Sequence, residues 1–160
     1  MDVLRLVVLV LAVLATGLHA GLYYTFAIAV MPGIGRTGDR TFVEATQHVN
    51  RAILNGWFAL AFAGAPILSL VAALLHLGAG QRGALPWVAA GFALNLAVFV
   101  ITMALNVPLN NALDRAGDPE HIADHGAVRT AFERPWSRLN VVRALVCLAA
   151  FAALTVALVD

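Results

Sequence analysis

Four residues near the C-terminus have a spacing that would place them on one face of a helix. They are Trp136, Asn140, Arg143 and Cys147, at intervals of four, three and four residues. Arg143 lies about two turns inside an apolar stretch, where a charged side chain requires a partner, an anion or water. Either it binds an anionic ligand, or it extends to the membrane surface and fixes the end of the helix.

A second set of polar side chains surrounds a proline in Asn106-Val107-Pro108-Leu109-Asn110. Proline removes a backbone donor, and nearby amide side chains can bond to the carbonyl groups that it frees. The alternative is that Asn106 and Asn110 line a cavity as neutral hydrogen-bond donors. Asn95 lies in the middle of an apolar stretch and is expected to join two helices by a hydrogen bond.

A third set contains a histidine and forms one row on an expected helix. The row is Glu44, His48, Arg51 and Asn55, with Asn50 beside it. One interpretation is a solvated helix start with salt bridges between neighbouring turns. The other is that His48 accepts a proton near neutral pH. We prefer the first interpretation for Glu44 and leave the role of His48 open.

Three further histidines have weaker signals. His19 shares a helical face with Thr16 and Tyr23, and could be a hydrogen-bonded core residue, a proton relay, or a haem or metal ligand. His121 and His125 are four residues apart, a spacing that can hold a divalent metal. They have no clear third ligand, so a solvated helix face is the preferred interpretation and no metal site is predicted.

The composition indicates where these residues lie. The chain is 61% hydrophobic and only 12% charged, whereas soluble domains are usually about half apolar and a quarter charged. The excess apolar surface requires lipid. A net charge of +1 argues against a nucleic-acid partner, and a single cysteine excludes an internal disulfide. Phosphate-binding loops, dinucleotide fingerprints and Gly-x-Ser-x-Gly elbows are absent from the sequence.

The expected fold is all-α, an integral membrane four-helix bundle that forms a single domain over residues 1–160. Each span has roughly 20 mostly apolar residues, and the spans cover about residues 3–31, 52–77, 85–106 and 136–159. The first span is long enough to be a retained helix rather than a cleaved signal peptide.

Local signals predict where the helices begin and end. Pro32-Gly33 is expected to end the first helix, and Thr41 to Glu44 has the form of a capping box that starts the second. A kink is expected at Gly64-Ala65-Pro66. Asp118-Pro119 resembles a helix start, which predicts a short surface helix over residues 119–133 in the third loop.

The distribution of arginine predicts the orientation in the cell membrane. The first and third loops contain six arginines, whereas the side with both termini contains only Arg5 and Arg82. Cytoplasmic loops carry the excess of positive charge, so these two loops are expected to be cytoplasmic and the termini external. The six are Arg36, Arg40, Arg115, Arg129, Arg134 and Arg138.

Several segments together resemble a family of small four-span membrane proteins whose best characterised members are anthrone oxygenases. The resemblance covers nearly the whole chain in order, and its most specific parts are Asn-x-Pro-x-Asn and Trp-x3-Asn-x2-Arg. The matching segments are residues 21–26, running to Met31-Pro32-Gly33, followed by residues 47–53, 106–110 and 136–143.

The resemblance implies oxidation of a hydrophobic aromatic substrate by O2, without a conventional cofactor. Such a reaction requires a base, an oxyanion stabiliser and a dry pocket. We assign His48 as the base and Trp136 as a stacking surface. Enolate binding is assigned to Arg143 and four asparagines: Asn50, Asn106, Asn110 and Asn140. The expected partners are the lipid bilayer and a hydrophobic small molecule, with a homo-oligomer, haem or a metal left open.

Two other classes of function remain open. The first is a non-catalytic membrane protein that binds a quinone, a lipid or haem between its helices. The second is an accessory subunit whose polar end binds a partner protein. Membership of a fold does not transfer a reaction, so the sequence alone does not choose among the three.

Overall fold

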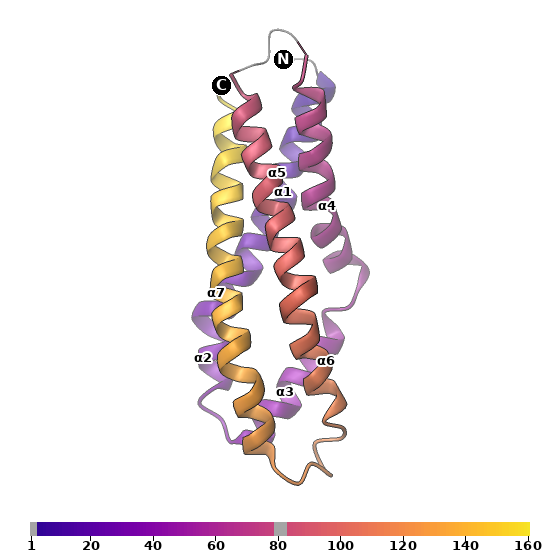
Figure 1. Cartoon of the computed structure of the whole chain (residues 1–160), viewed down its shortest axis with the longest axis vertical. Helices are drawn as coiled ribbons and strands as arrows, with labels where there is room; N and C mark the ends of the chain where they lie inside the picture. The colour runs from indigo at the N-terminus through magenta and orange to yellow at the C-terminus, as the bar shows by residue number, and fades with distance from the viewer. Residues whose placement is uncertain (1–2, 79–82) are drawn as a thin grey trace.

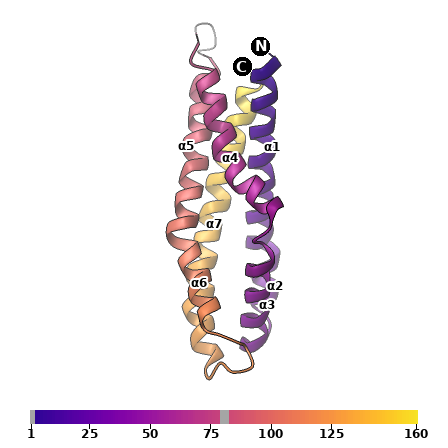
Figure 2. The same cartoon turned by 90° about the vertical axis from the view of Figure 1, so that its right-hand side faces the viewer.

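Four long apolar helical stretches run side by side along the molecule (Figure 1, Figure 2). The computed structural model describes residues 3–78 and 83–160, and these residues contain helices and connecting turns but no strand. Four stretches are long and apolar enough to cross a membrane, which confirms the predicted all-α membrane fold. They are Val3–Ile34, Gly56–Leu75, Leu85–Arg115 and His125–Ala157.

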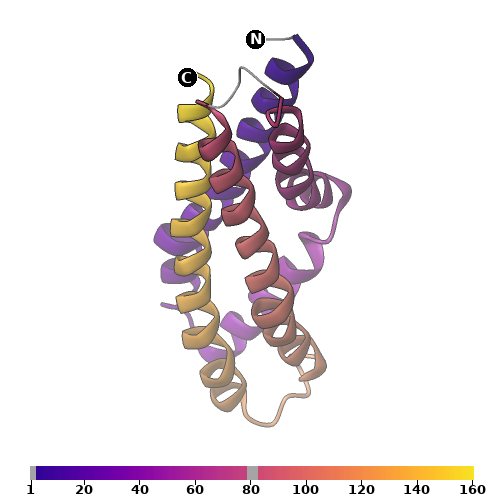
Figure 3. The ribbon, with the colours of Figure 1, turned by 45° about the horizontal axis from the view of Figure 1, so that its top comes forward.

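Both chain ends lie at the same end of the bundle (Figure 1, Figure 3). The second stretch ends and the third stretch begins at this end as well. The first and third connections therefore lie together at the opposite end, as four antiparallel spans require. This arrangement brings the two polar segments of the sequence into one region.

The first and third stretches each contain a wider, π-helical turn immediately before a proline. The backbone N–H of Met31 donates to the Phe26 carbonyl, and that of Val107 donates to the Thr102 carbonyl. Each bond spans five residues instead of four. In the first stretch the elements are α1 (Val3–Thr25), η1 (Phe26–Val30) and α2 (Met31–Ile34). In the third they are α5 (Leu85–Ile101), η2 (Thr102–Asn106) and α6 (Val107–Arg115).

These π-helical turns explain two differences from the predicted helix ends. Pro32 and Pro108 were expected to end or disturb their helices, but each lies in the first turn of the helix that follows a π-helical turn. A proline at this position costs little stability, because an N–H in the first turn would have no acceptor within the helix and because its fixed φ suits a helix start. The helices therefore continue to Ile34 and Arg115.

A break separates the second stretch from the helix that precedes it, where the sequence predicted one continuous helix. α3 (Asp39–Ala52) ends before residues 53–55, and α4 (Gly56–Leu75) starts after them. The side chain of Asn55 accepts a hydrogen bond of 3.0 Å from the Phe58 N–H and caps α4. The capping box at Thr41 was wrong, because Gly38 precedes α3 and Thr41 lies inside it.

The fourth stretch is one helix, α7 (His125–Ala157), and the separate surface helix predicted over residues 119–133 was wrong. Asp124 caps α7 by accepting a 2.8 Å hydrogen bond from the Ala127 N–H. Residues 119–121 form only a turn. His121 therefore precedes the helix and does not share a helical face with His125. The His125 ring lies 2.7 Å from the Pro119 carbonyl oxygen.

A cap formed by α2, α3, α6 and the first turns of α7 (residues 125–135) closes the end opposite the chain termini (Figure 2). Arg129 holds it together. Its guanidinium donates to the Gly35 and Thr37 carbonyls at 2.6 and 2.9 Å. It also pairs with the carboxylates of Asp39 and Glu133 at 3.0 and 2.6 Å. These contacts fix the connection between α2 and α3 on α7.

The cap is expected to extend beyond the lipid, because three of the four stretches are longer than a bilayer crossing requires. α4 has 20 residues, which corresponds to about 30 Å and matches the hydrocarbon core of a bilayer. The other stretches have 31 to 33 residues, so they are about 18 Å longer and extend past α4 on the side of the cap (Figure 1, Figure 2). The break at residues 53–55 therefore lies at the edge of the hydrocarbon.

Inside the membrane, Asn95 joins three helices, as predicted. Its amide donates to the Thr16 hydroxyl on α1 at 3.0 Å and to the Ser69 hydroxyl on α4 at 3.4 Å. The Cys147 thiol on α7 lies 3.5 Å from the Thr16 carbonyl oxygen. Helices in lipid associate through such bonds and through small residues that allow close approach.

At Gly91, α5 packs closely against α7. A Cβ at this position would lie 2.5 and 2.6 Å from Leu154 side-chain atoms. Replacing Gly91 by alanine is therefore expected to destabilise the protein by about 1–3 kcal/mol through overpacking, measured by unfolding in mixed detergent. Gly21→Ala is the matched control, because nothing lies within 4 Å of its Cβ position. Equal effects of the two substitutions would contradict this account of the α5–α7 contact.

Candidate functional site

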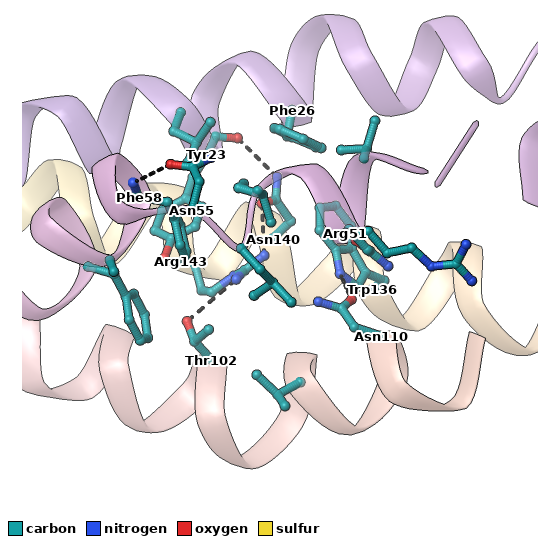
Figure 4. A pocket seen from close by; sticks show the side chains of 18 of the residues that line it. Tyr23, Phe26, Arg51, Asn55, Phe58, Thr102, Asn110, Trp136, Asn140 and Arg143 are labelled. Atoms are coloured by element: carbon teal, nitrogen blue, oxygen red, sulfur yellow. Dashed lines mark hydrogen bonds between the residues drawn. The ribbon is translucent and has the colours of Figure 1, made fainter. Parts of the chain in front are cut away.

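A cavity of about 660 Å³ lies where the four stretches meet the cap (Figure 4). Its wall contains residues of α1, the break between α3 and α4, η2 with α6, and α7. Most of the lining side chains are apolar or aromatic, and a few polar groups lie among them. A mainly apolar cavity with a small number of placed polar groups is typical of a site for a small hydrophobic molecule.

Arg143 is a buried cation on the wall of this cavity. Its side chain and backbone together are 5% exposed, and none of the described carboxylates lies within 4 Å of its guanidinium. It donates to the Asn140 side-chain oxygen at 3.1 Å and, at 3.4 Å, to the Thr102 hydroxyl. Its Nε–H is buried and has no partner among the described residues. A buried guanidinium without a carboxylate partner in a membrane segment can bind an anion.

Aromatic rings hold the guanidinium in place. Its central carbon lies 4.4 Å from the centre of the Tyr23 ring and 5.3 Å from that of Trp136. Cation–π contacts of this kind orient a charge without neutralising it. The hydroxyl of Tyr23 is also buried and lies near Thr102 and Arg143, although no hydrogen bond of standard geometry joins it to the described residues. Tyr23 and Arg143 are therefore neighbouring residues of the cavity wall, each with one buried donor that lacks a standard hydrogen bond.

Asn140 fixes the position of Arg143 relative to α1. Its amide nitrogen donates to the Tyr23 carbonyl at 3.0 Å, and its amide oxygen accepts from Arg143. Both polar atoms are thus occupied within the protein. Asn140 lines the cavity, but the structure gives it a positioning role between the two residues that carry free donors.

Trp136 and Asn110 form a second polar contact further toward the cap (Figure 4). The Trp136 Nε1–H donates to the Asn110 side-chain oxygen at 2.8 Å. The Trp136 ring also stacks on Phe132 and contacts Phe26, with ring centres 5.8 and 5.7 Å apart. Trp136 lines the cavity, although these neighbours already pack against much of its ring.

Only some of the other predicted site residues line the cavity. Asn50 lines the cavity, and its buried side-chain nitrogen has no partner among the described residues. Asn106 is fully buried on η2 with both side-chain polar atoms unpaired, but it is not part of this cavity wall. His48 is exposed on α3 and does not line the cavity either. The structure therefore brings five of the seven residues to one site and leaves His48 and Asn106 outside it.

Toward the cap, an ion pair bridges the wall of the cavity. The Arg51 guanidinium on α3 lies 2.6 Å from the Asp114 carboxylate on α6, and both residues line the cavity. Asp114 is the only carboxylate among the lining residues, and they include no histidine. It lies 12 residues beyond Thr102 along the same helical stretch, which corresponds to about 18 Å.

Sequence reasoning missed three contributors to the site and only partly detected a fourth. Phe58 and Phe62 form the membrane side of the cavity and pack on the buried His19, with ring centres 5.9 and 5.7 Å from it. Nothing in an apolar run marks such a phenylalanine. Thr102 also had no signal. Tyr23 had one, because it shares a helical face with His19.

A protein-family model named for anthrone oxygenase matches residues 55–153. This range is more than half of the chain. The chain belongs to the anthrone oxygenase family. Searches among curated proteins and among solved structures found no match. The matched range contains Phe58, Thr102, Asn110, Trp136 and Arg143, so most of the cavity of this anthrone oxygenase family member lies in the segment that defines the family. Tyr23 and Asn50 lie outside it.

Proposed function

We propose that the cavity binds a hydrophobic aromatic substrate of the anthrone class and that the protein promotes its oxidation by O2. The observation that carries the proposal is the position of Arg143, a buried cation without a carboxylate partner on the wall of an apolar cavity. An anthrone becomes an aromatic enolate when it loses a proton from its central CH2 group. The negative charge is on oxygen, where a guanidinium and a phenol can stabilise it.

The reaction balances without a further reductant. The enolate attacks O2 through carbon and, after taking up a proton, forms a hydroperoxide at that carbon. Loss of water then gives the ketone of a quinone, so that the CH2 group and O2 become C=O and H2O. The carbon loses four electrons and O2 gains four. The part that the site contributes is stabilisation of the enolate next to Arg143 and Tyr23.

The proton acceptor in this proposal is water rather than His48. The exposed position of His48 outside the cavity argues against direct contact with the substrate. Asp114 is about 18 Å from Thr102 along the helix, whereas the oxygen and the reacting carbon of an anthrone belong to one six-membered ring. Stabilising the enolate makes the CH2 group more acidic, so that water can accept its proton. His48→Ala is therefore expected to leave kcat and KM for an anthrone within about twofold of their original values.

The direct test is O2 consumption by purified protein in liposomes with 1,8-dihydroxyanthrone. We expect equimolar loss of O2 and anthrone, with the quinone as product and one atom of 18O2 in its new carbonyl group. Empty liposomes measure the spontaneous oxidation. A rate no greater than that of empty liposomes for this and other anthrones would contradict the proposed reaction.

Among the described lining residues there is no histidine, and the one carboxylate, Asp114, is paired with Arg51. This favours one alternative, a non-catalytic protein that holds a quinone or another lipid in the same cavity. This alternative predicts a bound quinone or lipid in extracts of the purified protein and no acceleration of O2 uptake. An absorption spectrum and metal analysis of the same sample test for haem and metals. The expected orientation, with the cap in the cytoplasm and the termini outside, remains a proposal based on the arginine distribution.

A further inference from the structure

We infer that the cavity receives its ligand from the bilayer, through a lateral opening between Leu54, at the break between α3 and α4, and Met103 on η2. Both residues line the cavity, and both are also exposed on the outside of the bundle, at 80% and 49%. The same side chains thus contact both the cavity and its surroundings. The inference rests on the proposed function only in that the cavity binds a hydrophobic aromatic molecule.

The level of this opening matches the membrane surface. α4 has the length of the hydrocarbon core, and Leu54 lies two residues before its first residue, Gly56. Trp57, in the first turn of α4, is 84% exposed, and tryptophan is enriched at the boundary between lipid and water. A flat aromatic molecule with hydroxyl groups collects at this same boundary, since one part of it is apolar and the other polar.

Toward the cap, the wall of the cavity is polar instead. The half-exposed Arg51–Asp114 ion pair joins α3 to α6 there, and both side chains line the cavity. A hydrophobic ligand that entered from this side would have to pass charged, hydrated groups, which favours the apolar side. On the membrane side, the break between α3 and α4 interrupts the helix that would otherwise cover the cavity. Leu54 and Met103 are apolar, so a ligand that passes between them loses no hydrogen bond or ion pair.

The test compares bulky substitutions at the opening with matched substitutions elsewhere on the same elements. Leu54→Trp and Met103→Trp narrow the opening. Leu60→Trp on α4 and Leu105→Trp on η2 are the controls, because both residues are exposed but do not line the cavity. Binding of 1,8-dihydroxyanthrone from liposomes is followed without O2 by stopped-flow absorbance. Association and dissociation rates are both measured, so that route and affinity are separated.

We expect Leu54→Trp and Met103→Trp to lower both rates by about tenfold, equivalent to about 1.4 kcal/mol in each barrier. The ratio of the two rates, and so Kd, should stay nearly constant, because the ligand enters and leaves by the same opening. The controls should behave as the unsubstituted protein. Unchanged rates, or a weaker Kd with an unchanged association rate, would overturn the inference. The inference would also be overturned if Asp114→Asn, which removes the ion pair with Arg51, raised both rates while the substitutions at Leu54 and Met103 changed neither.

Failure of the lateral opening and failure of the proposed oxidation give different results in this experiment. If the anthrone binds with the predicted rates but is not oxidised when O2 is admitted, the reaction fails and the lateral opening stands. If it is oxidised while the rates do not respond at Leu54 and Met103, the reaction stands and the opening is wrong. Absence of saturable binding to the unsubstituted protein would overturn both.

Discussion

Arg143→Met is expected to reduce kcat/KM for an anthrone by about a thousandfold and to make the protein more stable. The loss of activity would follow because Arg143 is the one buried cation among the described residues of the cavity wall, and we propose it as the main donor to the enolate oxygen. The gain in stability would follow because a charge without a counter-ion inside a membrane segment costs about 2.5–3.5 kcal/mol on insertion scales. We expect a gain of about 1–2 kcal/mol, since the contacts with Tyr23 and Trp136 are lost as well.

The paired change in activity and stability distinguishes a ligand site from a structural residue. If Arg143 merely fixed the end of its helix, its replacement would lower the free energy of unfolding and activity would fall only through unfolding. Arg138→Met, on an exposed position of the same helix, is the matched control and should change neither quantity by much. Arg143→Lys should recover part of the activity, because it restores the charge without the planar fork of donors.

Tyr23→Phe is expected to have the second largest effect, a decrease in kcat of about a hundredfold. Removing one donor from an oxyanion site typically costs this much or more. The buried Tyr23 hydroxyl has no partner among the described residues, so its removal should not destabilise the fold. Steady-state kinetics and detergent unfolding measure the two effects.

The adjacent tyrosine provides the control for this substitution. Tyr24 is exposed on the outer face of α1, and Tyr24→Phe should leave kcat unchanged. A large loss of stability in Tyr23→Phe without a change in kcat per folded molecule would mean that the hydroxyl serves packing rather than catalysis. Equal kinetic effects of the two substitutions would also contradict the proposed role of Tyr23.

The fold could be predicted from the sequence because the bilayer imposes a simple requirement, about 20 apolar residues in a helix for each crossing. The row from Trp136 to Arg143 was likewise visible, since it depends only on helical periodicity. The same local reasoning identified Asn95 as a link between helices, which the structure confirms with its bonds to Thr16 and Ser69.

The features that shape the cavity depend on contacts between distant segments, so local patterns did not indicate them. The two π-helical turns let the helices continue through Pro32 and Pro108, whereas proline rules predict an end. The break at residues 53–55 turns α3 so that His48 faces outward while Asn50 reaches the cavity wall. Helical spacing predicted that His48 and Arg51 share one face of the helix, but it does not indicate which residues of that face line the cavity.

The most direct test of the account is the absorption spectrum of 1,8-dihydroxyanthrone bound to the protein at neutral pH without O2. Binding beside Arg143 should convert the ligand largely to its enolate, which absorbs at longer wavelength than the neutral form, and Arg143→Met should bind it in the neutral form or not at all. A ligand that stays neutral in the unsubstituted protein, or that is equally ionised in Arg143→Met, would contradict the claim that this cavity stabilises an aromatic enolate.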